Sequence, residues 1–218
     1  MKRPPKRRKL ASISLREQRK LEKRQRIRAA VREMFSRHGY ETATLRQIAR
    51  RAHVALGTLF NYAQDKRDLV FLVFNEELSE VTEEALNAAN AHKVFLDQLM
   101  GVGRAHYEFF ARNPVLSRIL LRELTFYSEG KQAAEFHRTR GRLLSGIEDL
   151  VRAAQRDGQI QSDEDARLIT RHLFLIFAGA LRWWIASQNP DPAEGLADLK
   201  RLLELQLSGL TAPPRKEL

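Results

Sequence analysis

Apolar residues recur along this chain at intervals of three and four positions, a spacing typical of amphipathic α-helices. Turn residues interrupt the pattern, with Gly39 after the first segment, Pro114 at the start of another and Pro190-Asp191-Pro192 between the last two. On these grounds we predict long helices over residues 15–38, 66–87, 93–112, 114–127, 131–157, 164–188 and 192–210. The predicted fold class is therefore all-α.

Residues 44–62 are predicted to form two short helices joined by a tight turn. In residues 45–52 the apolar positions fall at i, i+3, i+4 and i+7, and Thr44 before them belongs to the residue types that cap helix N-termini. Val54 fills the turn, and the second helix starts near Leu56 with Leu59 pointing inward. This is the layout of the DNA-binding helix-turn-helix, whose second helix enters the major groove. Spacing alone leaves an ordinary helical hairpin as an alternative, which the flanking sequence makes untenable.

The two C-terminal helices are apolar on more than one face. Such a helix must be buried on two sides, and Ala178-Gly179-Ala180 would let a partner helix approach closely. We predict a dimer interface of four helices, two from each subunit, in which the contacting residues are Leu173, Phe174, Phe177, Leu181, Leu199, Leu203 and Leu207. On pattern alone, the alternative is an internal pair of core helices.

Composition narrows the class of protein. The chain has 218 residues, of which 43% are apolar, and this is enough for a sizeable core. It contains no cysteine, which excludes disulfides and thiolate metal sites and fits a reducing cytoplasm. The most hydrophobic window, Leu173 to Leu181, is much shorter than the roughly 20 residues that a spanning helix needs. No transmembrane segment is predicted.

Positive charge is concentrated at the N-terminus. The net charge is +11, and residues 1–26 contain twelve Lys or Arg against two Glu. Such a run favours a polyanionic partner, most often nucleic acid, with an anionic membrane surface as the rival. We expect residues 1–25 to form an arm, disordered to helical, in which Arg7 and Arg8 contact DNA phosphates or reach the minor groove. A solubilising tail is the alternative.

Residues 27–69 carry many spaced positions in one register: Ile27-(x2)-Ala30-(x4)-Phe35-(x3)-Gly39, then Thr44-(x3)-Ile48-Ala49-(x2)-Ala52-(x)-Val54-(x2)-Gly57-Thr58-Leu59-Phe60-Asn61-Tyr62-(x3)-Lys66-(x2)-Leu69. This pattern resembles the N-terminal signature of the TetR (tetracycline repressor) family. The resemblance implies an all-helical, dimeric transcriptional regulator of the cytoplasm, usually a repressor released from DNA by a small-molecule inducer. His53 and Ala55 depart from the family's frequent Gly and Ser, so the operator sequence stays unpredicted.

The resemblance also divides the chain. A helix-turn-helix DNA-binding domain is expected over residues 26–72, a helical ligand-binding and dimerisation domain over residues 73–212 and a tail over residues 213–218. A two-fold dimer places its recognition helices about 34–36 Å apart, one turn of DNA, and so fits a palindromic operator.

Residue roles in the helix-turn-helix follow from position and resemblance together. Thr44 caps the first helix and offers its hydroxyl to phosphate, while Arg46 reaches a phosphate or a base edge. Tyr62 and Lys66 are expected to bind phosphates, with a core aromatic as the alternative for Tyr62. Short groups on the exposed side of the second helix are expected to contact bases, namely Leu56, Thr58 and Asn61.

A ligand pocket is expected between the middle helices. Aromatic residues at helical spacing are more often plain core than ligand wall, and Arg122 beside Glu123 is more simply an internal ion pair. The expected inducer is hydrophobic or amphipathic. The predicted lining consists of aromatic residues and of polar residues in apolar settings, namely Tyr107, Phe110, Arg122, Phe126, His137, Phe177 and Trp183.

Two other classes of function are alternatives to a regulator. An architectural protein would use the arm for mostly non-specific contact with nucleic acid, and its signature is a steep salt dependence without sequence preference. An enzyme would need a catalytic constellation. The sequence has no His-x3-His pair at metal-ligand spacing, no Gly-rich phosphate loop and no Gly-x-Ser-x-Gly elbow. We therefore expect no catalysis, no metal and no cofactor.

Overall fold

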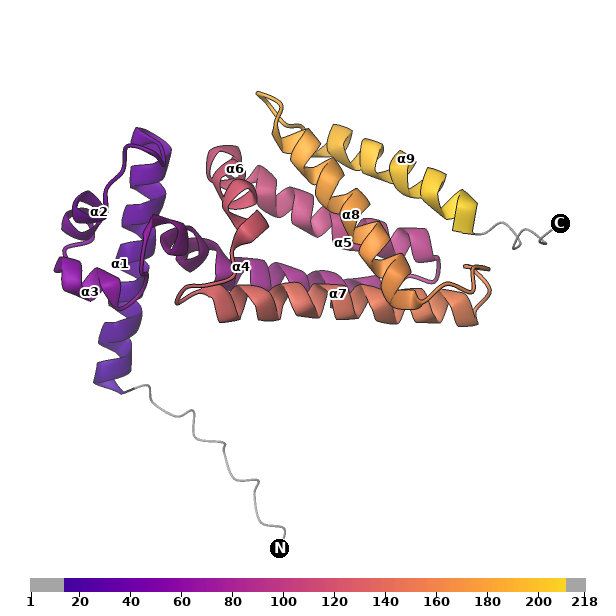
Figure 1. The fold of residues 1–218 in the computed structure, drawn as a ribbon, viewed down its shortest axis with the longest axis horizontal. Coiled ribbons are helices and arrows are strands. Elements are labelled where there is room, and N and C mark those ends of the chain that lie inside the picture. Colours follow the sequence, from indigo (N-terminus) through magenta and orange to yellow (C-terminus); the bar gives the residue numbers. More distant parts are fainter. Residues whose placement is uncertain (1–13, 211–218) are drawn as a thin grey trace, which may run out of the picture.

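The computed structural model describes residues 14–210, and in this range every regular element is a helix (Figure 1). The all-α prediction is confirmed. Arg7, Arg8 and the predicted tail lie outside the described residues. The elements are α1 Leu15–His38, α2 Leu45–Arg51, α3 Leu56–Phe60, α4 Lys66–Ala89, α5 Phe95–Ala111, α6 Pro114–Glu123, the 3-10 helix η1 Leu124–Phe126, α7 Ala133–Arg156, α8 Ala166–Ile185 and α9 Pro192–Leu210.

Local capping explains where most helices begin. Ser14 and Glu17 form a reciprocal capping box at the start of α1, and Asp65 accepts a hydrogen bond from the Asp68 backbone at the start of α4. Several predicted boundaries differ by a few residues. Helix α4 continues past residue 87 to Ala89, whose side chain is buried. Helix α6 ends at Glu123, and the chain tightens into η1 before reaching Tyr127.

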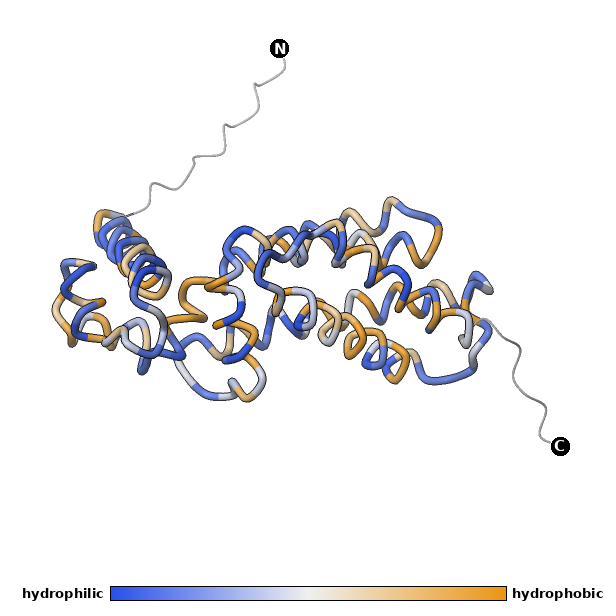
Figure 2. Tube along the Cα trace, turned by 90° about the horizontal axis from the view of Figure 1, so that it is seen from above, coloured by the Kyte–Doolittle hydropathy of each residue, from blue (hydrophilic) through white to orange (hydrophobic). Residues whose placement is uncertain are grey.

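The molecule is elongated, with α1, α2 and α3 at one end (Figure 1). Helix α4 leaves this end and runs beside α7 and α5 through the rest of the molecule, while α8 and α9 pack together on the side away from α4. Buried apolar residues form one connected core from α1 to α9, and the first turns of α1 are mostly hydrophilic (Figure 2). The end formed by α1, α2 and α3 and the helical body are therefore packed as one structure.

By length and composition, α8 could cross a membrane, since its 20 residues form one apolar helix. The apolar window found in the sequence, Leu173 to Leu181, is shorter than this helix. In the structure α8 packs against α7, α9 and α6, which is the position of a core helix. Its outer face nevertheless leaves Leu168, Leu175 and Trp183 exposed.

Helix α9 approaches α5 and α8 closely at Gly195. A Cβ atom at this position would lie 2.5 Å from Trp184 Cδ1 and 2.6 Å from Tyr107 Cε1. Both rings are buried and contact each other, with centroids 4.6 Å apart, so neither can move aside. We expect Gly195→Ala to lower the free energy of unfolding by about 1–3 kcal/mol in urea denaturation. Gly209→Ala in the same helix meets open space and is the control; equal stability of the two variants would contradict this packing.

Candidate DNA-binding surface and ligand cavity

The helix-turn-helix is held by its own side chains. The Thr44 hydroxyl accepts from the Gln47 backbone N–H at 3.3 Å, and Gln47 Oε1 accepts from the Thr44 backbone N–H at 2.9 Å. This reciprocal box starts α2. In the turn His53 adopts a φ of 53°, a left-handed conformation that a glycine adopts more easily. Helix α3 starts at Ala55 without a side-chain cap.

The predicted DNA contacts divide into two groups. Thr44, Arg46 and Asn61 are exposed, Thr58 is half-exposed, and Leu56 packs partly into the core. Two further residues have protein partners that the sequence did not reveal. The Tyr62 hydroxyl donates to the Lys20 carbonyl at 3.3 Å, and Lys66 Nζ donates to the carbonyls of Tyr40 and Glu41 at 2.7 and 2.9 Å. Phosphate contact by Tyr62 and Lys66 stays a prediction.

The first turns of α1 carry exposed cations beside the recognition helix. They extend past α3, and the bond between Tyr62 and Lys20 fixes them against its C-terminal end (Figure 1). Within residues 14–210, no salt bridge involves the basic residues of this stretch. Further along α1, by contrast, Arg28 and Arg32 both pair with Glu77. The exposed cations are Arg16, Arg19, Lys20, Lys23 and Arg26, called the α1 cation face below.

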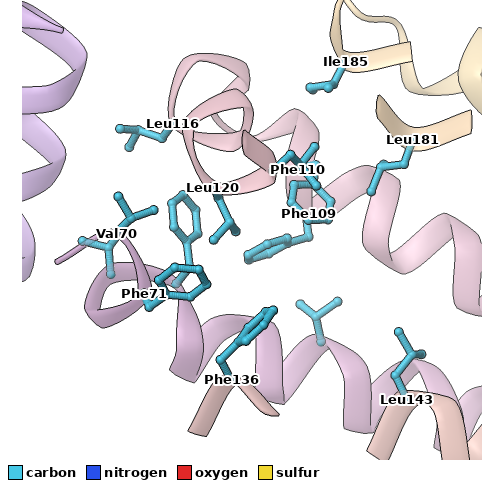
Figure 3. Packing of buried hydrophobic residues seen from close by; sticks show 14 of the residues in the cluster. Val70, Phe71, Phe109, Phe110, Leu116, Leu120, Phe136, Leu143, Leu181 and Ile185 are labelled. Atoms are coloured by element: carbon cyan, nitrogen blue, oxygen red, sulfur yellow. The ribbon is translucent and has the colours of Figure 1, made fainter. Parts of the chain in front are cut away.

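A cavity of about 480 Å³ lies in the helical body, bounded by α4, α5, α6, α7, α8 and η1. Most of its lining is apolar. Phe110 of α5, Phe136 and Leu143 of α7 and Leu181 of α8 approach one another around it (Figure 3). This volume falls within the roughly 300–1,000 Å³ of small-molecule sites.

Three buried polar side chains interrupt the apolar lining. His106 Nδ1 lies 2.8 Å from the Val102 carbonyl, and Nε2 lies 3.3 Å from Thr82 Oγ1. Burial lowers the pKa of His106, so its imidazole is neutral near pH 7. Thr139 is buried on α7, and its hydroxyl has no hydrogen-bond partner among the described residues.

Two arginines also line the cavity. Arg182 Nη1 donates to the Ala178 carbonyl at 3.1 Å, and the Arg140 guanidinium lies 5.6 Å from the centre of the Phe174 ring. Within the described part of the chain neither forms a salt bridge. Burial, followed by the nearby charge of Arg140, lowers the pKa of Arg182. The cavity therefore combines an apolar interior with two cations that lack an anion.

Two family models match the chain. Residues 27–73 match "Bacterial regulatory proteins, tetR family", and residues 92–194 match "Tetracyclin repressor-like, C-terminal domain". The chain belongs to the TetR family. The matched segments contain the helix-turn-helix and most of the helices around the cavity. The protein is accordingly a DNA-binding transcriptional regulator, and nothing supports the architectural alternative.

Individual relatives point the same way. A fatty acid metabolism regulator protein of Bacillus subtilis is 23% identical over 188 residues, which are 84% of this chain and 93% of that protein. The transcriptional repressor KstR of Mycolicibacterium smegmatis is 28% identical over 165 residues, 75% and 77% of the two chains. The structure of FadR from Bacillus subtilis in complex with stearoyl-CoA shares the fold, with a TM-score of 0.68, 21% identity and coverage of 85% of this chain and 98% of that chain. These relatives are transcriptional regulators rather than enzymes.

Only some of the predicted ligand-binding residues lie at the cavity of this TetR-family protein. Phe110 and Phe177 line it. The other five do not. Phe126 and Trp183 are each 83% exposed, and His137 is also exposed. Arg122 points toward the DNA-binding end, where it pairs with Glu41 and Glu123, and Tyr107 is buried against Trp184 instead.

Most of the predicted dimer contacts lie in the interior of the subunit. Leu173, Leu181, Leu199 and Leu203 are buried there and stabilise its core, and their contact with a second subunit stays a prediction. Phe174 and Phe177 are partly buried and line the cavity, while Leu207 packs partly on the core. Apolar side chains that α8 and α9 leave exposed are instead Leu168, Leu175, Trp183, Leu202 and Leu205.

A buried carboxylate joins the recognition helix to the cavity wall. Asp68 is fully buried in the first turn of α4 and accepts from the backbone N–H groups of Gln64, Lys131 and Gln132, each at 2.9 Å. It also accepts from the Tyr127 hydroxyl, whose pKa is raised by burial and by this bond. These five residues are called the Asp68 cluster below. Asp68 is not among the site residues predicted from the sequence.

The Asp68 cluster bridges the two functional regions of this TetR-family protein. Gln64 follows α3, whereas residues 127–132 follow η1, and Leu124 and Thr125 of η1 line the cavity. Gln132 Nε2 additionally donates to the Tyr62 carbonyl at 2.9 Å. Hydrogen bonds therefore connect the segment after the cavity-lining η1 to the segment after α3.

Proposed function

We propose that this protein is a homodimeric repressor that leaves a palindromic operator when an anionic amphipathic ligand occupies the cavity. The observation that carries this proposal is the pair Arg140 and Arg182, two cations without a carboxylate partner in a mainly apolar cavity. Arg182 is partly buried without a counter-ion, which is costly, and an anionic head group would relieve that cost through charge-assisted hydrogen bonds with Arg182 and with the exposed Arg140. An apolar body gains by leaving water, at about 25 cal/mol per Å².

Long-chain acyl-CoA esters are the first ligands to test. They have an apolar chain and a phosphate-bearing head, which matches the two halves of the cavity chemistry. The names of the relatives support the choice, because one regulates fatty acid metabolism and another structural relative is FadR from Thermus thermophilus in complex with lauroyl-CoA. A steroid with an acidic side chain is the second candidate, since the lining also fits a rigid apolar body.

The proposed dimer would form through the outer faces of α8 and α9. Trp183 is 83% exposed and Leu205 is 74% exposed, so each subunit leaves a large apolar surface in water. Exposed apolar patches of this kind mark protein interfaces. A two-fold arrangement of these helices would form the four-helix interface that the sequence predicted, but with outward-facing residues in place of the buried leucines.

Equilibrium binding to duplex DNA tests the function directly. The duplex is taken from beside the protein's own gene and compared with a scrambled duplex at near-physiological salt. A specific site is expected to bind ~10³-fold or more tightly than random DNA. Adding lauroyl-CoA or stearoyl-CoA is expected to weaken this binding, whereas coenzyme A alone is not. Simultaneous binding of DNA and acyl-CoA without mutual change in affinity would refute ligand-controlled release.

The two cavity arginines give a sharper prediction. Replacing both Arg140 and Arg182 with glutamine is expected to weaken acyl-CoA binding by roughly 10- to 100-fold, because two charge-assisted hydrogen bonds are lost. Calorimetric titration measures this, and DNA affinity without ligand should be unchanged. Arg138→Gln is the matched control, since Arg138 is also on α7 but pairs with Glu135 outside the cavity. A double variant that binds acyl-CoA as tightly as the Arg138 control would overturn the assignment.

A further inference from the structure

The cavity contains a small polar region whose hydrogen-bonding groups would find no partner on an unsubstituted apolar chain. Thr82 of α4, His106 of α5 and Thr139 of α7 all line it, and all three side chains are buried. We propose that the effector carries a hydroxyl group on its apolar body, which donates a hydrogen bond to His106 Nε2 and accepts one from the Thr139 hydroxyl. This inference rests on the proposed function, because it specifies the ligand of the same cavity.

The histidine supplies a hydrogen-bond acceptor. A backbone carbonyl can only accept, so the 2.8 Å contact with Val102 places the proton of His106 on Nδ1. Nε2 of the neutral ring then carries a lone pair. Burial of the ring disfavours a second proton there. His106 therefore needs a donor on its Nε2 side.

Thr82 does not supply that donor. Its hydroxyl has one proton and two neighbours, the Leu78 carbonyl at 2.7 Å and His106 Nε2 at 3.3 Å. The shorter contact has ordinary O–H···O length and takes the proton. Thr82 Oγ1 then faces Nε2 with a lone pair. The two acceptors lie close together with no proton between them.

Thr139 supplies a donor that is not used by the protein. It is 3% exposed, and its hydroxyl finds no partner within residues 14–210. Leaving such a group unpaired costs about 1–3 kcal/mol. A ligand hydroxyl can donate one hydrogen bond to His106 Nε2 and accept another from the Thr139 hydroxyl, so it satisfies both residues. A keto group can only accept and would satisfy Thr139 alone, and a methylene group would satisfy neither.

The test compares stearoyl-CoA with its monohydroxylated positional isomers and the corresponding keto esters, by calorimetric titration of the full chain. At least one hydroxy isomer is expected to bind about tenfold more tightly than stearoyl-CoA, and its keto counterpart is expected to gain less. In Thr139→Val the affinity difference between the hydroxy isomer and stearoyl-CoA, both measured on this variant, should disappear. His106→Phe preserves an aromatic ring against Phe177, and it should remove the gain as well.

Thr170→Val is the matched control. Thr170 is also 3% exposed with an unpartnered hydroxyl, but it lies on α8 outside the cavity lining. This variant should retain the full hydroxyl gain. The inference is overturned if every hydroxy isomer binds no more tightly than stearoyl-CoA, or if the gain persists in both Thr139→Val and His106→Phe. If no member of the series binds at all, the proposed acyl-CoA function fails together with the inference, and this outcome differs visibly from binding without a hydroxyl gain.

Discussion

Replacing Asp68 with asparagine is expected to lower the free energy of unfolding by about 3 kcal/mol. The carboxylate is fully buried and accepts four hydrogen bonds, three of them from backbone N–H groups. Asparagine has the same shape, but one of its terminal atoms becomes an NH₂ donor. In either orientation that NH₂ faces a backbone N–H, because Oδ1 serves Gln132 and Oδ2 serves Gln64 and Lys131. At least one buried donor is left unpaired.

Urea denaturation at fixed protein concentration measures this loss, since the stability of a dimer depends on concentration. Glu129→Gln is the control, because Glu129 is exposed in the same connection between η1 and α7. The milder Tyr127→Phe removes only the phenol and keeps the ring stacked on Phe71, with centroids 3.6 Å apart. It should cost about 1 kcal/mol. An Asp68→Asn loss no larger than that of Glu129→Gln would contradict the structural role of the cluster.

The same variants test whether the Asp68 cluster transmits the ligand signal. Coupling between two sites is a free energy, measured as the factor by which ligand changes DNA affinity. Tyr127→Phe loosens the link between η1 and α4 while leaving the cavity lining and α3 intact. We expect this factor to fall in Tyr127→Phe. If ligand changes the DNA affinity of Tyr127→Phe by the same factor as in the unmodified protein, the cluster stabilises the fold but does not transmit the signal.

The helices could be predicted because their signals are local. Spacing of apolar residues gives the inward face of each helix, and residues such as Ser14, Thr44 and Asp65 cap the N-termini through neighbours only three positions away. The helix-turn-helix was found for the same reason. Helix boundaries failed where tertiary burial decided them, as at Ala89.

The cavity could not be predicted in the same way. Periodicity shows that a helix has an apolar face but not whether this face meets packed core, a cavity or water. Trp183 and Trp184 illustrate the difference, because adjacent residues of one helix are exposed and buried respectively. Arg182 looks like a solvated helix charge in the sequence, whereas the structure buries it partly in the cavity lining. The partners of Asp68 at residues 127, 131 and 132 are 59, 63 and 64 positions away from it in the sequence, so no local pattern connects them.

The α1 cation face is expected to dominate the salt dependence of operator binding. Each phosphate contact contributes about 0.9 to the slope of log K against log salt concentration for duplex DNA. Replacing Arg16, Arg19 and Lys23 with glutamine should therefore reduce the slope by up to about 3, and affinity should fall roughly 100-fold at physiological salt. Glutamine has nearly the helix propensity of the residues that it replaces, so α1 is preserved.

Titration of operator and scrambled duplexes over a range of salt concentrations measures both effects. Affinity should fall by a similar factor for the two duplexes, because phosphate contacts carry no base information. Arg37→Gln is the control, since Arg37 is exposed on the same helix but already pairs with Glu33 at 3.0 Å. Both variants retain residues 1–13, so any difference between them belongs to the helical stretch. An unchanged slope in the triple variant would mean that α1 does not contact the backbone. A loss confined to the operator duplex would instead place these side chains at base edges.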